Sequence, residues 1–170
     1  MRTLFRVFLL CSIAALLISC SRSEKGAVDA NSGAAPLFVL ADPNNNRVSL
    51  EDYKGKVVML EFFATWCPPC QMAAPDVESV YEKYKDRGFV VLAVSIDEGS
   101  DRAAAVSSFV KDLHLTYPAL LDDGKTSGQY GVSSIPTSFI IDRQGKLRNR
   151  HVGLLPDYAA TLSKEIEALL

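Results

Sequence analysis

Residues 57–70 read VVMLEFFATWCPPC, and this stretch decides the fold. Val57 to Phe63 is apolar on both alternating faces apart from Glu61, which is the pattern of a central strand covered on both sides. Residues 70–87 follow with apolar side chains at helical spacing, and Gly88 is a suitable stop. The stretch therefore places two cysteines where a buried strand meets a helix.

The rest of the chain from about residue 36 alternates short apolar runs with helical patterns. The first two strands should form a hairpin around the turn-rich residues 42–46, and the last two should pair antiparallel. This order predicts an α/β fold with a mixed central sheet and helices on both faces. Strands are expected at 37–40, 48–50, 57–63, 89–96, 118–121, 137–141 and 147–152, and helices at 70–87 with a kink at Pro75, 100–113 with Ser100 as its cap, 126–130 and about 157–169.

Length and composition limit the kind of protein. A chain of 170 residues suits one domain with appendages. Hydrophobic residues make up 48% and charged residues 22%, which argues against a disordered, collagen-like or coiled-coil chain. The net charge of -2 and the lack of a long basic run give no electrostatic attraction for nucleic acid. We therefore expect one packed core and no nucleic-acid partner.

The amino terminus has the pattern of a targeting segment. Two arginines precede an apolar run, and the uncharged interval 7–21 is shorter than the roughly 20 apolar residues of a spanning helix. A signal peptide over residues 1–19 is therefore favoured over a permanent transmembrane helix. Residues 17–20 (LISC) resemble the bacterial lipoprotein box, which implies a lipid on Cys20; a cysteine near an ordinary cleavage site is the alternative. Residues 20–35 have the composition of a flexible tether, so the domain should span 36–170.

Cysteine positions point to chemistry at the start of the helix. Removal of Cys11 with the leader and lipidation of Cys20 would leave Cys67 and Cys70 as the only free thiols. A helix start stabilises an anion such as a thiolate. Cys67 could then attack a disulfide, and Cys70, one turn along, could resolve the intermediate. A metal clip remains open, whereas a purely structural loop this short would add little stability.

Residues 60–70 (LEFFATWCPPC), with Pro75 and residues 135–137 (IPT), resemble the thioredoxin superfamily. The leader, the hairpin and an added helix-strand segment around 101–121 are similar to the membrane-tethered TlpA and ResA group of thiol-disulfide oxidoreductases, within the wider redoxin and AhpC/TSA class. The resemblance covers about residues 36–170. It implies a thioredoxin fold and a redox-active disulfide, with no other cofactor.

The resemblance also implies roles for individual residues. Pro136 matches the family's cis-proline, and the backbone of Ile135 would align the incoming polypeptide. Glu61 lies where thioredoxins have a buried aspartate that exchanges protons with the inner cysteine. Burial of a carboxylate is costly, so the pKa of Glu61 should be raised, unless the side chain reaches solvent or a salt-bridge partner. Trp66 would shield the thiol, or simply pack. The expected catalytic residues are Cys67, Cys70 and Glu61, and the expected substrate-binding residues are Trp66, Ile135 and Pro136.

Ala73 departs from the family pattern, and the two prolines between the cysteines affect the redox potential. Ala73 stands where the ResA-like group commonly has a glutamate, three residues after the inner cysteine. As a hypothesis, we assign part of that proton handling to Glu61. Pro68 and Pro69 have no backbone N–H to donate to the sulfur of Cys67 and bring no positive charge. A less stabilised thiolate predicts a reducing couple.

The resemblance implies a monomeric, periplasm-facing lipoprotein of the inner or outer membrane that reduces disulfides in envelope clients such as apocytochrome c. A membrane thiol-electron donor would recharge it. The alternative from another class is a copper metallochaperone that uses the same two cysteines, with Met72 and His151 as further ligands. A peroxiredoxin is the rival among enzymes, but Thr65 lies two residues before Cys67 rather than three, so peroxidase activity is not expected.

Overall fold

The computed structural model describes residues 33–170, which form one seven-stranded mixed sheet in the order β2-β1-β5-β4-β3-β6-β7. The expected signal peptide 1–19, the lipidation site Cys20 and most of the tether lie outside the described residues. The strands are β1 Val39–Ala41, β2 Arg47–Ser49, β3 Val57–Phe63, β4 Phe89–Ser95, β5 Ala119–Leu121, β6 Thr137–Ile141 and β7 Leu147–Val152. The helices are η1 Leu50–Tyr53, α1 Pro68–Tyr84, η2 Lys85–Arg87, α2 Arg102–Asp112, α3 Thr126–Gln129 and α4 Tyr158–Glu167, where η marks a 3₁₀ helix.

Strand β3 lies at the centre of the sheet and is buried along its whole length. It pairs parallel with β4 and antiparallel with β6. Its apolar side chains alternate between two cores, with Met59 and Phe63 in one and Leu60 and Phe62 in the other. The apolar character of both faces therefore reflects a strand covered on both sides, as the sequence predicts.

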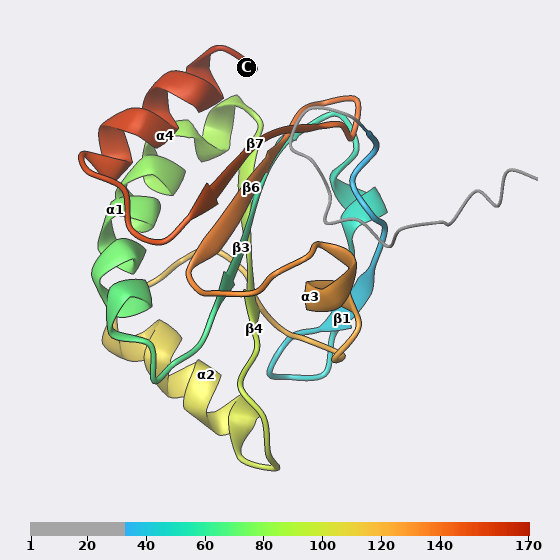
Figure 1. The fold of residues 1–170 in the computed structure, drawn as a ribbon, viewed down its shortest axis with the longest axis vertical. Coiled ribbons are helices and arrows are strands. Elements are labelled where there is room, and N and C mark those ends of the chain that lie inside the picture. Colours follow the sequence, from blue (N-terminus) through green and yellow to red (C-terminus); the bar gives the residue numbers. More distant parts are fainter. Residues whose placement is uncertain (1–32) are drawn as a thin grey trace, which may run out of the picture.

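Helices cover both faces of the sheet unequally. Helices α1, α2 and α4 lie on one face and α3 on the other (Figure 1). On the face of α3, Tyr130 packs against Phe62 and Phe139, with ring centroids 5.6 and 5.1 Å away. Its hydroxyl donates to the carbonyl oxygen of Pro36 at 2.7 Å, which ties the start of the domain to this core. The predicted α/β class, mixed sheet and two-sided helix cover are confirmed.

The first strands form the expected hairpin and join the inserted segment. β1 and β2 pair antiparallel, and β1 also pairs antiparallel with β5 through Ala41 and Leu121. The chain before β1 is also placed against the sheet, since the backbone N–H of Ala35 donates to the carbonyl oxygen of Gly145 at 2.8 Å. The helix-strand insertion, α2 and β5, thus connects the hairpin to the central strands.

Two helix starts differ from the predictions. Helix α1 begins at Pro68 rather than Cys70, because the side chain of Cys67 accepts the Cys70 N–H as an N-cap and the prolines that follow need no N–H partner in the first turn. The prediction of a Ser100 cap is wrong: α2 begins at Arg102 after Asp101, and neither the cap nor Ser100 supplies a side-chain hydrogen bond. Gly99, at φ +92°, begins a turn that delays this helix.

None of the helices within residues 33–170 has the length and apolar character that a membrane span requires.

Candidate active site

Cys67 and Cys70 form a disulfide at the amino-terminal end of α1, with their Cα atoms 5.3 Å apart. Both residues are largely buried, at 4% and 3% exposed. The backbone N–H of Cys70 donates to the Cys67 sulfur at 3.3 Å. Pro68 and Pro69 between them have no N–H to offer. Within the four-residue loop, the Cys67 sulfur therefore accepts a hydrogen bond from one backbone amide, that of Cys70.

The loop before Cys67 is held by a network of polar side chains. Thr65 donates its N–H and its hydroxyl to the two carboxylate oxygens of Asp97, at 2.9 and 2.6 Å. The hydroxyl of Ser95 donates to the same carboxylate at 2.6 Å, and the side-chain amide of Gln71 donates to the Thr65 carbonyl at 2.8 Å. The backbone N–H, the hydroxyl and the carbonyl oxygen of Thr65 are thus all hydrogen-bonded. These bonds fix the backbone that leads into Trp66 and Cys67.

The segment before β6 faces the disulfide. The peptide bond between Ile135 and Pro136 is cis, as the family resemblance implies. The Cys67 sulfur lies 3.9 Å from the carbonyl oxygen of Ile135. Gly153, just after β7, donates its N–H to the Pro136 carbonyl at 2.7 Å. Trp66 is 67% exposed, so it is not a packed core residue.

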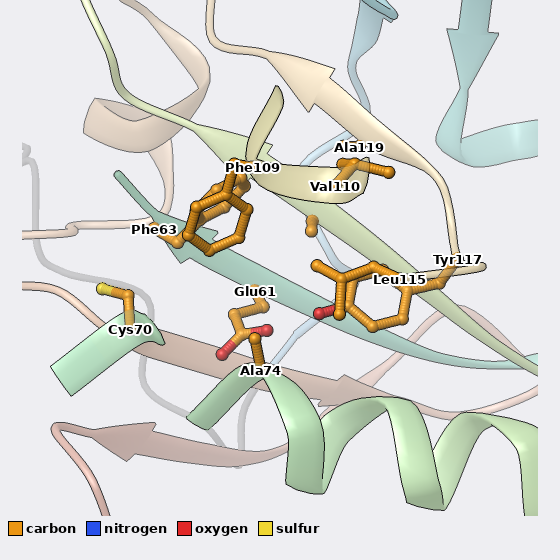
Figure 2. A pocket seen from close by; sticks show the side chains of 10 residues that line it. Glu61, Phe63, Cys70, Ala74, Phe109, Val110, Leu115, Tyr117 and Ala119 are labelled. Atoms are coloured by element: carbon orange, nitrogen blue, oxygen red, sulfur yellow. The ribbon is translucent and has the colours of Figure 1, made fainter. Parts of the chain in front are cut away.

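Glu61 is buried beside the inner cysteine. Its side chain is 4% exposed and forms no salt bridge within residues 33–170, which contradicts the solvent-reaching and ion-paired alternatives. It lines a small cavity of about 10 Å³ together with Cys70, Ala74 and Tyr117, and its carboxyl group points into that space (Figure 2). Burial disfavours the charged form and raises the pKa of Glu61 to about 7. An acid that titrates near neutrality therefore lines the same cavity as Cys70.

The small neighbours of Glu61 explain this space. In the sheet, Glu61 is paired with Ala93 of β4 and Ser138 of β6. Ser138 forms a hydrogen bond of 3.2 Å with the hydroxyl of Tyr158 on α4. Burial raises the pKa of Tyr158, and the charge of Glu61 contributes in the same direction. The side chains that line the space beside the carboxyl are mostly apolar, and none of them is a cation.

The other candidate residues differ in their surroundings. Ala73 is fully buried on α1. Met72, on the same helix, is 65% exposed. His151 on β7 forms a hydrogen bond of 2.8 Å with Glu165 of α4. The described part of the chain contains no group of three or more His, Cys, Asp or Glu residues that could hold a metal ion.

Sequence reasoning did not identify Asp97 or Gln71, although both hold the loop that presents Cys67. The signal for Asp97 was its place two residues after β4. The carboxyl ends of parallel strands meet at one edge of a sheet, so a polar residue there lies close to whatever follows β3. The partner of Gln71 had no comparable signal, because its contact depends on how α1 turns away from the sheet.

A buried disulfide at a helix start, opposite a cis-proline and on a mixed sheet, defines a disulfide oxidoreductase of the thioredoxin fold. The model of the AhpC/TSA family matches residues 32–150. The chain is 41% identical over 120 residues to the thiol-disulfide oxidoreductase ResA of Bacillus cereus, covering 70% of this chain and 68% of that protein. The chain belongs to the AhpC/TSA family, within the thioredoxin superfamily, and is ResA-like.

Two further comparisons agree with this assignment. The thiol-disulfide oxidoreductase ResA of Bacillus subtilis is 35% identical over 147 residues, covering 86% of this chain and 80% of that protein. A solved structure of a candidate DsbE, a thiol:disulfide interchange protein of Chlorobium tepidum, matches with a TM-score of 0.73 and 36% identity. That match covers 80% of this chain and 94% of the other.

Proposed function

We propose that this oxidoreductase works as a reductase, passing two electrons from Cys67 and Cys70 to disulfides of client polypeptides. The observation that carries the proposal is the disulfide at the start of α1, with two prolines inside the loop. A thiolate at Cys67 receives no backbone hydrogen bond from either proline. Loss of one charge-assisted hydrogen bond, about 1.5 to 3 kcal/mol, lowers the potential of a two-electron couple by roughly 30 to 60 mV.

The reaction begins with the dithiol form. The Cys67 thiolate attacks one sulfur of the client disulfide, that disulfide breaks, and the first client sulfur leaves as a thiolate. Cys70 then loses its proton and attacks the Cys67 sulfur, which releases the second client thiolate and forms the Cys67–Cys70 disulfide. The client gains two electrons and takes up two protons. A donor dithiol reverses the same steps to recharge the protein.

Glu61 is the group proposed to accept the proton of Cys70. The position of Glu61 supports this role, because Glu61 and Cys70 line the same cavity (Figure 2). Its pKa of about 7 suits a group that both accepts and releases a proton near neutrality. Ala73 leaves no carboxyl at the position three residues after Cys70. Glu61 then acts as the base when Cys70 attacks and as the acid when the disulfide is reduced again.

The leader pattern supports work outside the cytoplasmic membrane. In this proposal residues 1–19 are removed, Cys20 carries a lipid, residues 20–35 are a tether and residues 36–170 form the domain. The protein is then a monomeric lipoprotein of the cell envelope, without a cofactor besides its disulfide. Its partners are a membrane thiol-electron donor and envelope clients such as apocytochrome c, whose cysteines must be reduced before haem attachment.

The deciding measurement is the redox potential of the Cys67–Cys70 couple, combined with trapping of a mixed disulfide through Cys67 in a Cys70→Ala variant. We expect a potential clearly below that of protein disulfide isomerase, about -180 mV. We also expect the trapped client to be released by a reductant and to be absent in a Cys67→Ala variant. A potential near that of DsbA, about -120 mV, would contradict a reductase.

A further inference from the structure

The chain enters the domain at the end of the sheet that lies opposite the disulfide. Ala34 and Lys146 form an isolated antiparallel bridge. The N–H of Leu147, the first residue of β7, donates to the Gly33 carbonyl at 3.1 Å. The start of β7 pairs with the end of β6, and the end of β6 pairs with the beginning of β3. The disulfide follows the other end of β3, roughly 20 Å away for a strand of seven residues (Figure 1).

A hollow of about 220 Å³ opens at this end of the sheet. Its lining combines apolar side chains with a tyrosine and two lysines, and it includes Leu37, Tyr53, Lys54 and Lys56. Leu37 is 60% exposed, and the ammonium group of Lys56 lies 5.8 Å from the centre of the Tyr53 ring. Together with Lys146, which is exposed at the adjacent turn, these four residues form what we name the entry face. Exposed apolar and aromatic side chains beside lysines are typical of surfaces that lie at a membrane interface.

The lysines of the entry face have no acidic partner in the domain. None of Lys54, Lys56 and Lys146 forms a salt bridge within residues 33–170. The exposed acids beside them are Glu51, which lines the hollow, and Asp52, whose carboxylate takes part in the capping box of η1. The face therefore carries positive charge that no salt bridge neutralises, although the whole chain has a net charge of -2.

Exposed charges at the disulfide end of the sheet are mostly acidic. Glu98 and Asp101 follow β4, and Asp123 follows β5, which pairs parallel with β4. Lys125 is the exposed base that accompanies them. An anionic surface would therefore attract one end of the sheet and repel the other.

A tether to the membrane does not by itself orient the domain. In the proposed function residues 20–35 form the tether, and residues 20–32 of it precede the described chain. A tether of this length has an r.m.s. reach of roughly 20 Å, which is similar to the length of β3. Either end of the sheet could then face the membrane, so a further contact is needed to hold one orientation.

We propose that the entry face binds the anionic phospholipid headgroups of the membrane, so that the disulfide faces away from the bilayer. The proposal rests on the proposed function, which attaches the chain to a membrane, and adds the surface that orients it. Lys54, Lys56 and Lys146 contact the lipid phosphates, and Leu37 and Tyr53 lie at the level of the headgroups. Salt weakens this attraction because the lysines are exposed.

Trp66 reports the orientation, because it is the only tryptophan of the chain and is exposed beside Cys67. The processed full chain is reconstituted into vesicles of phosphatidylcholine, or of phosphatidylcholine and phosphatidylglycerol in equal parts, each with a trace of dansyl-labelled headgroups. Energy transfer from Trp66 to dansyl rises as the tryptophan approaches the bilayer. We expect transfer at low salt to be about twofold lower in the anionic vesicles than in the neutral ones, and equal in both at high salt. Equal transfer at low salt, or higher transfer in the anionic vesicles, would overturn the proposal.

Variants assign the effect to the entry face. A Lys54→Glu, Lys56→Glu variant should raise the transfer in anionic vesicles to the value in neutral ones. A Lys111→Glu, Lys125→Glu variant makes the same change in net charge at exposed lysines outside the face and should keep the low transfer. Unfolding curves and redox potentials of both variants confirm an intact fold and couple. Equal behaviour of the two variants would mean that net charge governs the approach to the membrane, which contradicts the entry face.

Flotation separates this proposal from the proposed function. A lipidated chain floats with both kinds of vesicle. A chain that floats with neither contradicts the anchor and the entry face together. Flotation with the anionic vesicles alone, lost in the Lys54→Glu, Lys56→Glu variant, contradicts the anchor and supports the entry face. Failure to reduce client disulfides in solution contradicts the reductase alone.

Discussion

Glu61 is a buried acid on the central strand, and this position links protein stability to pH. Its pKa rises from 4.5 to about 7 on burial. Between these values the native protein keeps the proton that the unfolded chain has released, so the contribution of Glu61 to stability is greatest below pH 4.5 and falls as the pH rises to 7. The loss amounts to about 3 kcal/mol, at 1.36 kcal/mol for each pKa unit.

Glu61→Gln removes this titration and keeps the size of the side chain. We expect the variant and the wild type to have similar free energies of unfolding near pH 4.5, and the variant to be more stable by up to about 3 kcal/mol at pH 8. Urea unfolding of the oxidised proteins across this range measures the difference. The exposed Glu98→Gln is the control and should show no such trend. A difference that does not vary with pH would contradict the buried acid.

Asp97 connects the end of β4 to the loop that presents Cys67. Its carboxylate accepts three hydrogen bonds, two from Thr65 and one from Ser95. Asp97→Ala leaves these donors without a partner, so we expect a loss of about 2 to 4 kcal/mol in stability and slower disulfide reduction, on the order of tenfold. Thr65→Val removes one of the bonds and should cost about 1 kcal/mol. Denaturant unfolding and stopped-flow reduction of a client peptide test both; unchanged kinetics in Asp97→Ala would show that the loop needs no such support.

At the scale of the elements, α4 covers the sheet beside α1 (Figure 1). Its buried stripe includes Leu162, which is fully enclosed in the core. Leu162→Ala should lower the free energy of unfolding by about 2 to 5 kcal/mol, because the lost contacts leave a cavity. Ala160→Ser, at an exposed position of the same helix, should change it by less than about 0.5 kcal/mol. A comparable effect of the two substitutions, in guanidinium unfolding, would mean that α4 is not packed as described.

The elements that the sequence predicts well are those whose own residues determine them. Residues 57–63 and 89–95 are apolar on both faces and form the central strands, and their boundaries differ little from the predictions. The start of α2 was missed because a turn at Gly99 shifts the helix, which Ser100 as a residue type does not reveal. The order of the strands in the sheet could not be predicted from the sequence either, because pairing between β1 and β5 joins residues that are far apart in the chain.

At the candidate site the same distinction holds. The two cysteines could be chosen from a local motif, and Glu61 and Pro136 from the resemblance to the thioredoxin superfamily. The structure places them around one end of α1. The contact of Thr65 with Asp97 spans 32 residues of sequence and depends on the sheet register. Long-range contacts of this kind follow from the packing of the whole fold, which no local pattern encodes.

For the molecule as a whole, the redox potential and the stability are parts of one thermodynamic cycle. If the folded protein holds the Cys67–Cys70 disulfide better than the unfolded chain does, the disulfide stabilises the fold by the same free energy. A reducing couple corresponds to this case, because its folded state favours the oxidised form. Each 30 mV by which the native potential lies below that of the unfolded chain corresponds to about 1.4 kcal/mol.

We therefore expect the reduced protein to unfold at a lower guanidinium concentration than the oxidised protein. The difference in free energy should equal the difference in potential between native and unfolded protein, at about 1.4 kcal/mol for 30 mV. Unfolding curves of both redox forms, with redox titrations in buffer and in concentrated guanidinium, measure every side of the cycle. A Cys67→Ala, Cys70→Ala variant, which cannot form the disulfide, should show no dependence on redox conditions. A reduced form more stable than the oxidised one would mean that the fold stabilises the thiolate, and the protein would then be an oxidant of its clients.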